Sequence, residues 1–276
     1  MRTATTRPHV LLAILLATTC VVAQARAQNP PPTGVDPLWD HYKVYELVQP
    51  YVLPVPIPVN LTDQFGQYFH QVYVLDKFMN PVEKRVGMTA NPQVFPIHDA
   101  LLHYTWWQIS PQPFAATVAA TNQFGDQTLL VHDAVYLLNP ALKNQTGTAL
   151  PQKNHYKCYL CDGLPVNVPI IMIDQFDTWQ ATVQYPRFFC NPVKKQVGTA
   201  SEGGPVYPIV DPNQHYICYD YQPIDPGTFG AIITDQFVNN LHVELYPSRF
   251  ICVPTLKNNV TATTRNTWGK MKMLYR

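Results

Sequence analysis

The chain repeats one pattern four times, and this repetition constrains its fold more than any other feature. Each copy begins with a His-Tyr pair, contains Asp-Gln-Phe or Asn-Gln-Phe, and ends in a run with Pro and Lys. The pairs start at His41, His103, His155 and His215, the tripeptides at Asp63, Asn122, Asp174 and Asp235, and the final runs are 80–84, 139–143, 191–194 and 253–257. A unit of about 45 residues is too small to hold a core alone, so we expect the copies to fold together.

The four copies, called modules one to four (38–86, 98–144, 152–196 and 212–258), also form two similar pairs. Asp63 and Asp174 lie 111 residues apart, as do Asn80 and Asn191. The joint within each pair has the same pattern, Val-Gly followed by Val-x-Pro-Ile, whereas the joint between the pairs differs. A pair has an ordinary domain size. The spacing therefore predicts two homologous domains near 36–148 and 149–262, each built from two half-modules.

The residue usage predicts strands. Charged residues make up 13% of the chain, and it contains 27 Pro and 16 Tyr. Each module alternates apolar and polar residues in short runs that are separated by Pro, Gly and Asn. We expect an all-β fold of two tandem β-sandwich or barrel-like domains. The pattern leaves open which of these two forms occurs.

The N-terminal residues predict export. Residues 1–27 combine Arg2 and Arg7, a short apolar stretch and Ala25-Arg26-Ala27, which together resemble a secretory signal peptide. Residues 28–37 read as a Pro-rich leader and residues 263–276 as a basic tail. We expect a secreted protein, extracellular or periplasmic, with no transmembrane segment after the signal. The formal net charge of +1 gives no argument for a nucleic-acid partner.

The cysteines occupy two columns of the repeat. Cys158 and Cys218 align with Val44 and Trp106, and Cys190 and Cys252 align with Met79 and Leu138. Two columns that are both Cys in modules three and four, and both apolar in one and two, are expected to be in contact. We therefore predict the disulfides Cys158–Cys190 and Cys218–Cys252, which suit an exported protein.

Cys161 is left without a partner. The favoured interpretation is a free thiol. A Cys-x-x-Cys redox or zinc site with Cys158, and an intermolecular disulfide, remain alternatives.

No catalytic residue, metal site or cofactor is predicted. The chain has neither the Gly-x-Ser-x-Gly sequence nor a Gly-rich phosphate loop. The Asp column could supply calcium ligands, but a calcium site needs several converging oxygens, so a turn in which Asp or Asn accepts backbone N–H bonds is favoured. The four His-Tyr pairs are read as strand entries.

Aromatic residues are the remaining candidates for ligand binding. Trp106, Trp107 and Trp179 fall in or beside expected loops and strand ends, where an exposed ring can stack on a sugar or contact a partner protein. A core position is the alternative for each of them.

The motifs His-Tyr-x-Cys-Tyr, Asp-Gln-Phe and Phe-x-Cys-x-Pro-x-x-Lys resemble an uncharacterised family of secreted bacterial β repeats, a domain of unknown function. The resemblance covers nearly all the chain after the signal. It is most specific in modules three and four and looser in one and two, where both Cys columns are lost. It implies a repeat architecture and no particular activity.

We expect a non-enzymatic repeat protein that binds to, or forms part of, an extracellular or cell-envelope structure. Its partner would be an envelope or extracellular protein or a glycan. Two alternatives are a secreted hydrolase with a non-standard site between the domains and a carbohydrate-binding module that uses Trp106, Trp107 or Trp179.

Overall fold

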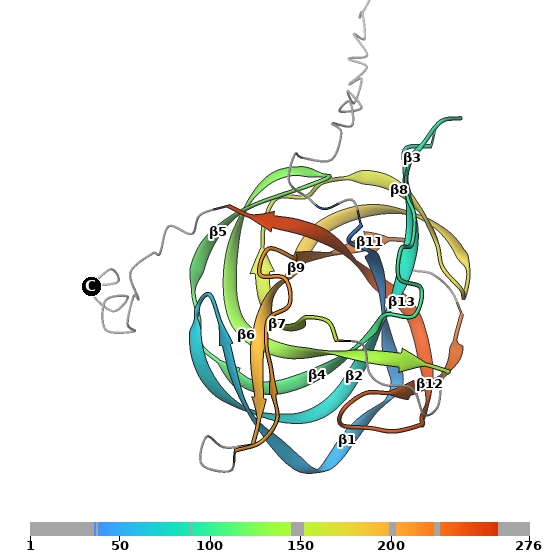
Figure 1. The fold of residues 1–276 in the computed structure, drawn as a ribbon. Helices are drawn as coiled ribbons and strands as arrows, with labels where there is room; N and C mark the ends of the chain where they lie inside the picture. The colour runs from blue at the N-terminus through green and yellow to red at the C-terminus, as the bar shows by residue number, and fades with distance from the viewer. Residues whose placement is uncertain are drawn as a thin grey trace, which may run out of the picture.

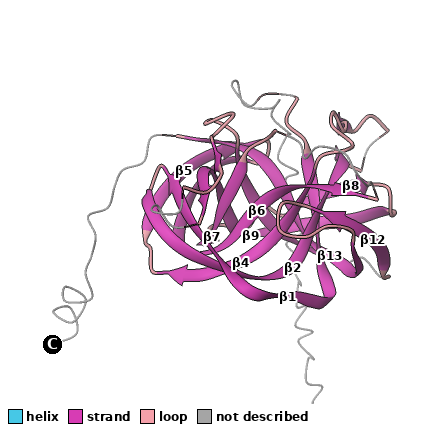
Figure 2. Cartoon of the chain, turned by 60° about the horizontal axis from the view of Figure 1, so that its bottom comes forward, coloured by secondary structure: helices cyan, strands magenta, loops and turns pink. Residues whose placement is uncertain are grey.

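The computed structural model describes residues 36, 38–88, 90–144, 152–198, 203–223 and 227–258, which form strands and loops (Figure 2). The predicted signal peptide, the basic tail and all of the leader except Asp36 lie outside these residues. The strands are β1 (His41–Asp63), β2 (Gly66–Val86), β3 (Gln93–Phe95), β4 (His103–Gln112), β5 (Ala116–Asn122), β6 (Gly125–Lys143), β7 (His155–Asp162), β8 (Val168–Ile173), β9 (Thr178–Val197), β10 (Val206–Tyr207), β11 (His215–Gln222), β12 (Phe229–Thr234) and β13 (Leu241–Lys257). The all-β prediction is confirmed.

No helix among the described residues could span a membrane.

Eight of the strands close into one ring. Antiparallel pairing runs in the order β1, β13, β11, β9, β7, β6, β4 and β2, and β2 pairs again with β1. Figure 1 shows these strands curving around a common centre. Each module contributes two neighbouring strands to the ring, its His-Tyr strand and the strand that ends in the Pro-Lys run.

This closed ring differs from the predicted pair of tandem domains. The ring crosses the expected boundary twice, where β6 pairs with β7 and where β1 pairs with β13. A pair of modules alone would leave a strand edge at each side, and closing the ring removes these edges. The 111-residue spacing therefore reflects two similar halves of one ring.

A closed circle of four tyrosines fills the ring at one level. The ring centroids of successive partners are 5.2–5.8 Å apart in edge-to-face contact, in the order Tyr42, Tyr104, Tyr156 and Tyr216. All four side chains are buried. Side chains from alternate strands of a closed sheet can meet in this way only on its inner face, so this tyrosine layer lies inside the ring.

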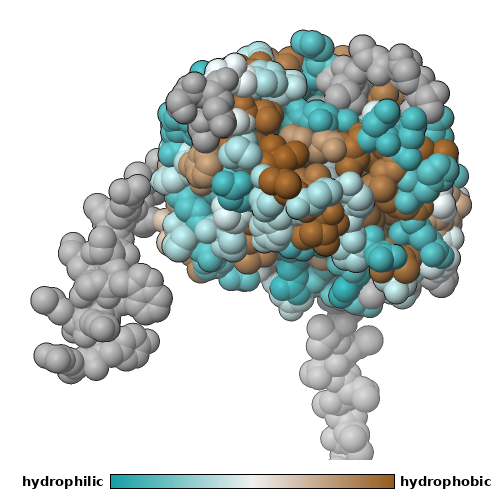
Figure 3. Space-filling view, turned by 90° about the horizontal axis from the view of Figure 1, so that it is seen from below, coloured by the Kyte–Doolittle hydropathy of each residue, from teal (hydrophilic) through white to brown (hydrophobic). Residues whose placement is uncertain are grey.

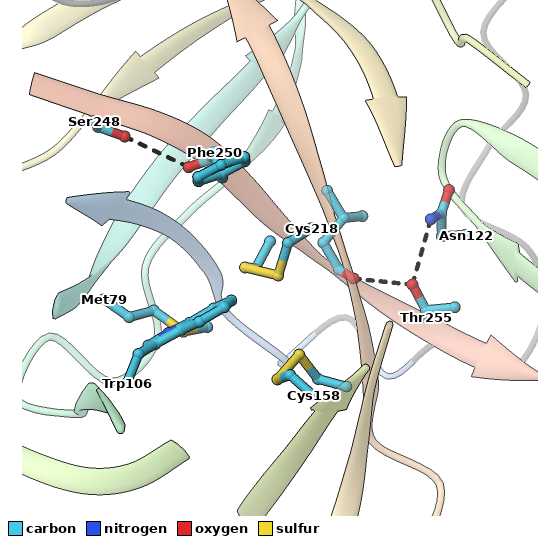
Figure 4. Close-up of a disulfide and its surroundings, with 11 residues drawn as sticks. Met79, Trp106, Asn122, Cys158, Cys218, Ser248, Phe250 and Thr255 are labelled. Carbon is cyan, nitrogen blue, oxygen red and sulfur yellow. Dashed lines mark hydrogen bonds between the residues drawn. A yellow bond between two sulfur atoms is a disulfide. The ribbon is translucent and has the colours of Figure 1, made fainter. Parts of the chain in front are cut away.

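The two disulfides form the next layer on the inner face (Figure 4). Cys158 bonds to Cys190 and Cys218 to Cys252, the two pairs that the columns predict. In modules one and two the aligned apolar side chains, Val44 with Met79 and Trp106 with Leu138, stand opposite each other across paired strands and are buried. The two disulfides indicate an oxidising compartment.

A second and larger core lies on the other face of the ring strands. Neighbouring residues of a strand point to opposite faces, so Tyr159 and Cys161 join this core while Cys158 faces inward. Hairpins cover this second core. They carry the Gln-Phe turns, extend from the ring strands, and include the short strands β5, β8 and β12. Figure 3 shows apolar residues in patches among polar ones on the face that includes the side of β1.

Each Asp of the repeated tripeptide docks on the module two places along the ring. The Asp63 carboxylate accepts a backbone N–H bond from Phe65 and the hydroxyl of Tyr159, at 2.7 Å. Asp174 likewise accepts the hydroxyl of Tyr45, at 2.6 Å. The corresponding contacts are Trp107 Nε1 to Asp235, and Asn122 Nδ2 to the Tyr219 hydroxyl.

In modules one, two and three the charge of this position matches the residue that it faces, whereas Asp235 of module four faces the neutral Thr105 and accepts its hydroxyl. Asp63 lies 3.6 Å from Lys157, whereas the neutral Asn122 faces a module with Ile217 at the position of that lysine. The structure therefore supports the interpretation of the Asp or Asn position as part of a turn that docks on another module, rather than as a calcium ligand. Among the described residues no cluster of three or more His, Cys, Asp or Glu side chains could hold a metal.

The lysine of each Pro-Lys run lies over the Phe of the next module's turn. The distances from Nζ to the ring centroid are 4.9 Å for Lys84 and Phe124, 4.1 Å for Lys143 and Phe176, 5.3 Å for Lys195 and Phe237, and 4.7 Å for Lys257 and Phe65. Together with the contacts of the Asp and Asn side chains, these lysine–Phe contacts join each module to the other three.

In module three this lysine is Lys195. The run 191–194 stops one residue short of it, because strand β9 turns Lys194 outward and buries Lys195 completely, and the motif Cys-x-Pro-x-x-Lys also ends at Lys195. The corrected column places the lysine three residues after Pro in every module.

The disulfide pairing predicts a matched loss of stability. Each bond closes a loop of more than 30 residues, so replacing Cys158 and Cys190 together by Ala should lower the free energy of unfolding by about 3–4 kcal/mol. The same change at Cys218 and Cys252 should have a similar effect. Urea unfolding measures both. Peptide mapping of the unreduced protein that joined Cys158 to Cys218 would contradict the assignment.

The docking contacts predict a strong dependence on the buried carboxylates. Replacing Asp174 by Ala leaves Tyr45 and Asn80 without their shared acceptor and removes one of the two carboxylates beside Lys43, so it should lower the free energy of unfolding by about 3–5 kcal/mol. The control is Asp126→Ala at an exposed position of β6, which should change the free energy of unfolding by less than about 0.5 kcal/mol. Equal effects of the two changes, measured by urea unfolding, would contradict the docking role.

Candidate functional site

A third layer follows the tyrosine and cystine layers on the inner face of the ring. It contains one residue from each of the eight ring strands, two positions beyond the cystine layer, and we call it the mouth layer. Its pairs are Glu46 and Lys77 in module one, Gln108 and Tyr136 in module two, Leu160 and Phe188 in module three, and Asp220 and Phe250 in module four.

The three layers differ in how far the modules agree. The tyrosine layer is identical in all four, and the cystine layer has two forms, disulfide and apolar pair. In the mouth layer every module has a different pair. The repeat therefore keeps the inner layers for packing and varies the residues at the open end.

Modules one and two fill their side of the mouth with a polar network. The carboxylate of Asp76 accepts the amide of Gln108 at 2.7 Å, the hydroxyl of Tyr136 at 3.0 Å and the ammonium of Lys77 at 3.2 Å. Burial, followed by the charge of Asp76, raises the pKa of the Tyr136 phenol, so this hydroxyl stays protonated and donates. One side of the mouth is thus closed by a fixed set of hydrogen bonds.

Modules three and four leave a hollow on the opposite side. Its volume is about 450 Å³, within the roughly 300–1,000 Å³ of small-molecule sites. The hollow is lined by residues of β6, β7, β9, β11 and β13, namely His132, Leu160, Cys161, Asp162, Arg187, Phe188, Asp220, Tyr221, Gln222, Arg249 and Phe250.

Aromatic rings support one wall of the hollow. Phe188 contacts Phe250 edge to face, with centroids 5.4 Å apart, and it contacts Trp106 at 5.3 Å and Tyr136 at 5.7 Å. Phe188 is buried, Phe250 is half-buried, and Leu160 beside them is 41% exposed. Packing on several sides holds these rings in place, so the wall is preorganised for an apolar surface.

Ion pairs form the rim of the hollow. Arg187 donates from Nε and Nη2 to the same oxygen of Asp220, both at 2.7 Å. His132 Nε2 lies 2.8 Å from Asp162, and Arg249 lies 3.6 Å from Glu46 of the mouth layer. The rim is polar, and each of these side chains has a neighbour of opposite charge when His132 is protonated.

Cys161 is among the residues that line the hollow, and its free thiol is buried in the core on the other face of the ring strands. Burial raises the pKa of this thiol, and the neighbouring Asp162 raises it further. The thiolate is the reactive form, so Cys161 is a poor nucleophile here. Cys158 is held in a disulfide, which leaves no dithiol for a Cys-x-x-Cys redox or zinc site.

The structure does not offer the predicted tryptophans as exposed stacking surfaces. Trp106 and Trp107 are completely buried. Trp106 packs behind Phe188, and Trp107 donates its indole N–H to Asp235. Trp179 is half-buried on β9, donates to the carbonyl of Pro223, and is not among the residues that line the hollow. The first two lie on ring strands rather than in loops, and both faces of those strands are covered.

Apart from Cys161, none of the residues that line the hollow is among the candidates drawn from the sequence. A signal was present, because Leu160, Phe188, Asp220 and Phe250 lie two positions from the four paired cysteines in the aligned columns. Their relevance depends on knowing that the two columns lie on the inner face of a closed ring, which residue alternation cannot show.

The family assignment agrees with the module boundaries. The model of a family described as a repeat of unknown function, DUF7450, matches residues 103–257, more than half of the chain. The chain belongs to the DUF7450 family. The DUF7450 match begins at the His-Tyr pair of module two and ends at the last lysine of module four. No curated protein and no solved structure matches the chain.

Module one lies before the DUF7450 match, yet it contributes to every layer of the ring. It supplies Tyr42 to the tyrosine layer, Val44 and Met79 to the cystine layer, and Glu46 and Lys77 to the mouth. We therefore treat it as a further copy of the same repeat.

The buried histidines of the His-Tyr pairs predict acid sensitivity. Burial lowers the pKa of His103 and of His215 to about 3, so both are neutral in the folded state and protonate near pH 6.5 in the unfolded chain. Because the unfolded chain then binds more protons, the free energy of unfolding should fall as the pH drops below about 6.5. At pH 5 the loss is about 2 kcal/mol per histidine.

Urea unfolding at pH 7 and pH 5 measures this effect. The variant His103→Gln/His215→Gln should show a smaller loss between the two pH values, whatever its stability at pH 7. The control His242→Gln, on an exposed position, should keep the full loss. An unchanged loss in the double variant would contradict the assignment.

Proposed function

We propose that this chain is an exported, non-catalytic binding protein whose ligand occupies the hollow at the mouth of the ring. The observation that carries the proposal is the mouth layer, the only one of the three layers in which all four modules differ. A packing requirement common to the copies would keep this layer alike, as it does the tyrosine layer. Variation confined to the open end fits a specific ligand better.

The rigidity of the surrounding structure supports a binding role. Two disulfides lie directly below the hollow, in the layer between Phe188 or Phe250 and the tyrosines. The Asp76 network closes the opposite side. A site held in one shape loses little conformational entropy when a ligand binds, which favours affinity.

The non-catalytic part of the proposal rests on the groups at the hollow. The thiol of Cys161 has a raised pKa, and Asp220 and Asp162 are held by Arg187 and His132. Burial lowers the pKa of Lys84 and of Lys195 well below the usual value, and these two lysines lie over Phe124 and Phe237 in the contacts between modules. A preformed pocket next to fixed ion pairs suits recognition more than proton transfer.

Export is part of the same proposal. The disulfides require an oxidising compartment, and the N-terminal residues have the composition of a signal peptide. A ligand of the cell envelope or the extracellular medium follows from this location.

Filling the hollow should abolish binding without unfolding the protein. Leu160 is 41% exposed, so Leu160→Trp adds an indole to the hollow with little strain on the core. The matched control is Leu164→Trp, at a residue that is 80% exposed and does not line the hollow. Thermal unfolding should give similar midpoints for both variants.

A mixed library of small molecules, oligosaccharides and peptides, analysed by affinity selection and mass spectrometry, provides the measurement. Compounds retained by the unmodified protein and by Leu164→Trp should be lost by Leu160→Trp. Retention that is indifferent to Leu160→Trp, or no retained compound at all, would contradict a ligand site in the hollow. Conversion of a retained compound to products would contradict the non-catalytic role.

A further inference from the structure

The hollow combines an apolar wall with a rim whose charges are already paired. The wall consists of Leu160, Phe188 and Phe250. The rim carries Arg187, Arg249, Asp162 and Asp220, two positive and two negative side chains. This combination restricts the chemistry of the ligand that it can take.

A charged ligand would have to compete with an existing ion pair. Arg187 is held by two hydrogen bonds to Asp220, and the other oxygen of Asp220 accepts the backbone N–H of Tyr185 at 2.7 Å. A carboxylate or phosphate that took Arg187 would leave Asp220 facing a second negative charge. A cation that took Asp220 would displace Arg187 in the same way. The pair is partly exposed, so losing it costs little by itself. The like charge that then faces the ligand is what disfavours the exchange.

Uncharged hydroxyl groups can bind without breaking these pairs. A guanidinium has five N–H donors. The contacts of Arg187 with Asp220 involve only its Nε and Nη2 atoms, so Asp220 does not occupy the remaining N–H groups. Gln222 lies on the same rim, is exposed, and adds an amide that can both donate and accept. A hydroxyl donates and accepts as well, so it can bridge such planar groups, and bonds to charged partners are the stronger ones.

The apolar wall suits the C–H face of a sugar ring. Phe250 and Leu160 are partly exposed, whereas Phe188 behind them is only 7% exposed. A ligand with one apolar face and hydroxyls around its edge would contact the wall and the rim together. The hollow of about 450 Å³ has room for about one or two such rings.

We propose that the ligand of the hollow is a neutral carbohydrate, bound with its C–H face on Leu160 and Phe250 and its hydroxyls on Arg187, Asp220 and Gln222. This inference rests on the proposed function, because it assigns a ligand class to the same site. It does not use Trp107 or Trp179, which are not among the residues that line the hollow, and it uses Trp106 only as support behind Phe188.

The test is titration of the purified protein with three matched panels. These are neutral oligosaccharides of two to four residues (gluco-, xylo-, manno- and galacto-series), acidic oligogalacturonides of the same lengths, and short peptides. Isothermal titration calorimetry gives the dissociation constants. We expect at least one neutral series to bind, and the acidic series and the peptides to bind at least tenfold more weakly or not at all.

Two variants locate the site and test the charge argument. Leu160→Ser should weaken the neutral ligand at least tenfold, and the control Leu164→Ser should leave its affinity unchanged. Asp220→Asn keeps the shape of the side chain but leaves Arg187 without its counter-charge. It should weaken the neutral sugar and strengthen the acidic series at least tenfold. Circular dichroism and the thermal midpoint report whether each variant is folded.

The outcomes separate this inference from the proposed function. Peptide or acidic-sugar binding that Leu160→Ser abolishes would overturn the neutral carbohydrate and keep the hollow as a binding site. Sugar binding that Leu160→Ser and Asp220→Asn leave unchanged would overturn both. Failure of all three panels to bind would overturn the carbohydrate inference, because the neutral panel spans the sizes that fit. Release of shorter sugars would keep the ligand class and overturn the non-catalytic role.

Discussion

The fold depends on the burial of a polar turn. The Asp or Asn of each Gln-Phe tripeptide is buried between modules, where an unpaired carboxylate or amide costs several kcal/mol. It finds its hydrogen-bond donor in the module two places along the ring, as Asp63 does with Tyr159 and Asp174 with Tyr45. The lysine of the preceding module covers the Phe of the same turn. No module can satisfy its own turn, so the four must assemble as one ring.

This interlocking leaves one part of the repeat free to vary. The tyrosine layer and the docking turns are tied to other modules, and a change in one copy would have to be matched elsewhere. The neutral Asn122 opposite Ile217, in place of Asp opposite Lys, shows such a matched change within the chain. The mouth layer faces the opening, so its side chains have fewer contacts that the fold requires. The hollow beside Phe188 and Phe250 formed there, over the two modules that carry disulfides.

The sequence could predict the local order and much of the covalent structure, but it could not show how the strands close. Alternation and turn residues were enough for an all-β chain, and the paired columns were enough for Cys158–Cys190 and Cys218–Cys252. The ring requires β1 to pair with β13, at opposite ends of the repeat, and no local pattern encodes that contact. The sequence also could not show that Trp106 and Trp107 are buried. Both faces of the strand that carries them are covered by modules distant in the sequence. Once the ring is known, the mouth residues can be read from the cysteine columns.

The central claim is that four interlocked modules form a single cooperative unit, and the isolated halves test it most directly. Residues 36–148 and 149–262 can be produced separately under oxidising conditions and compared with the whole chain by urea unfolding and amide hydrogen exchange. We predict one cooperative transition for the whole chain, and no cooperative transition or protected core for either half alone. A half that unfolded cooperatively by itself, with the hydrogen-exchange protection it has in the whole chain, would contradict the account.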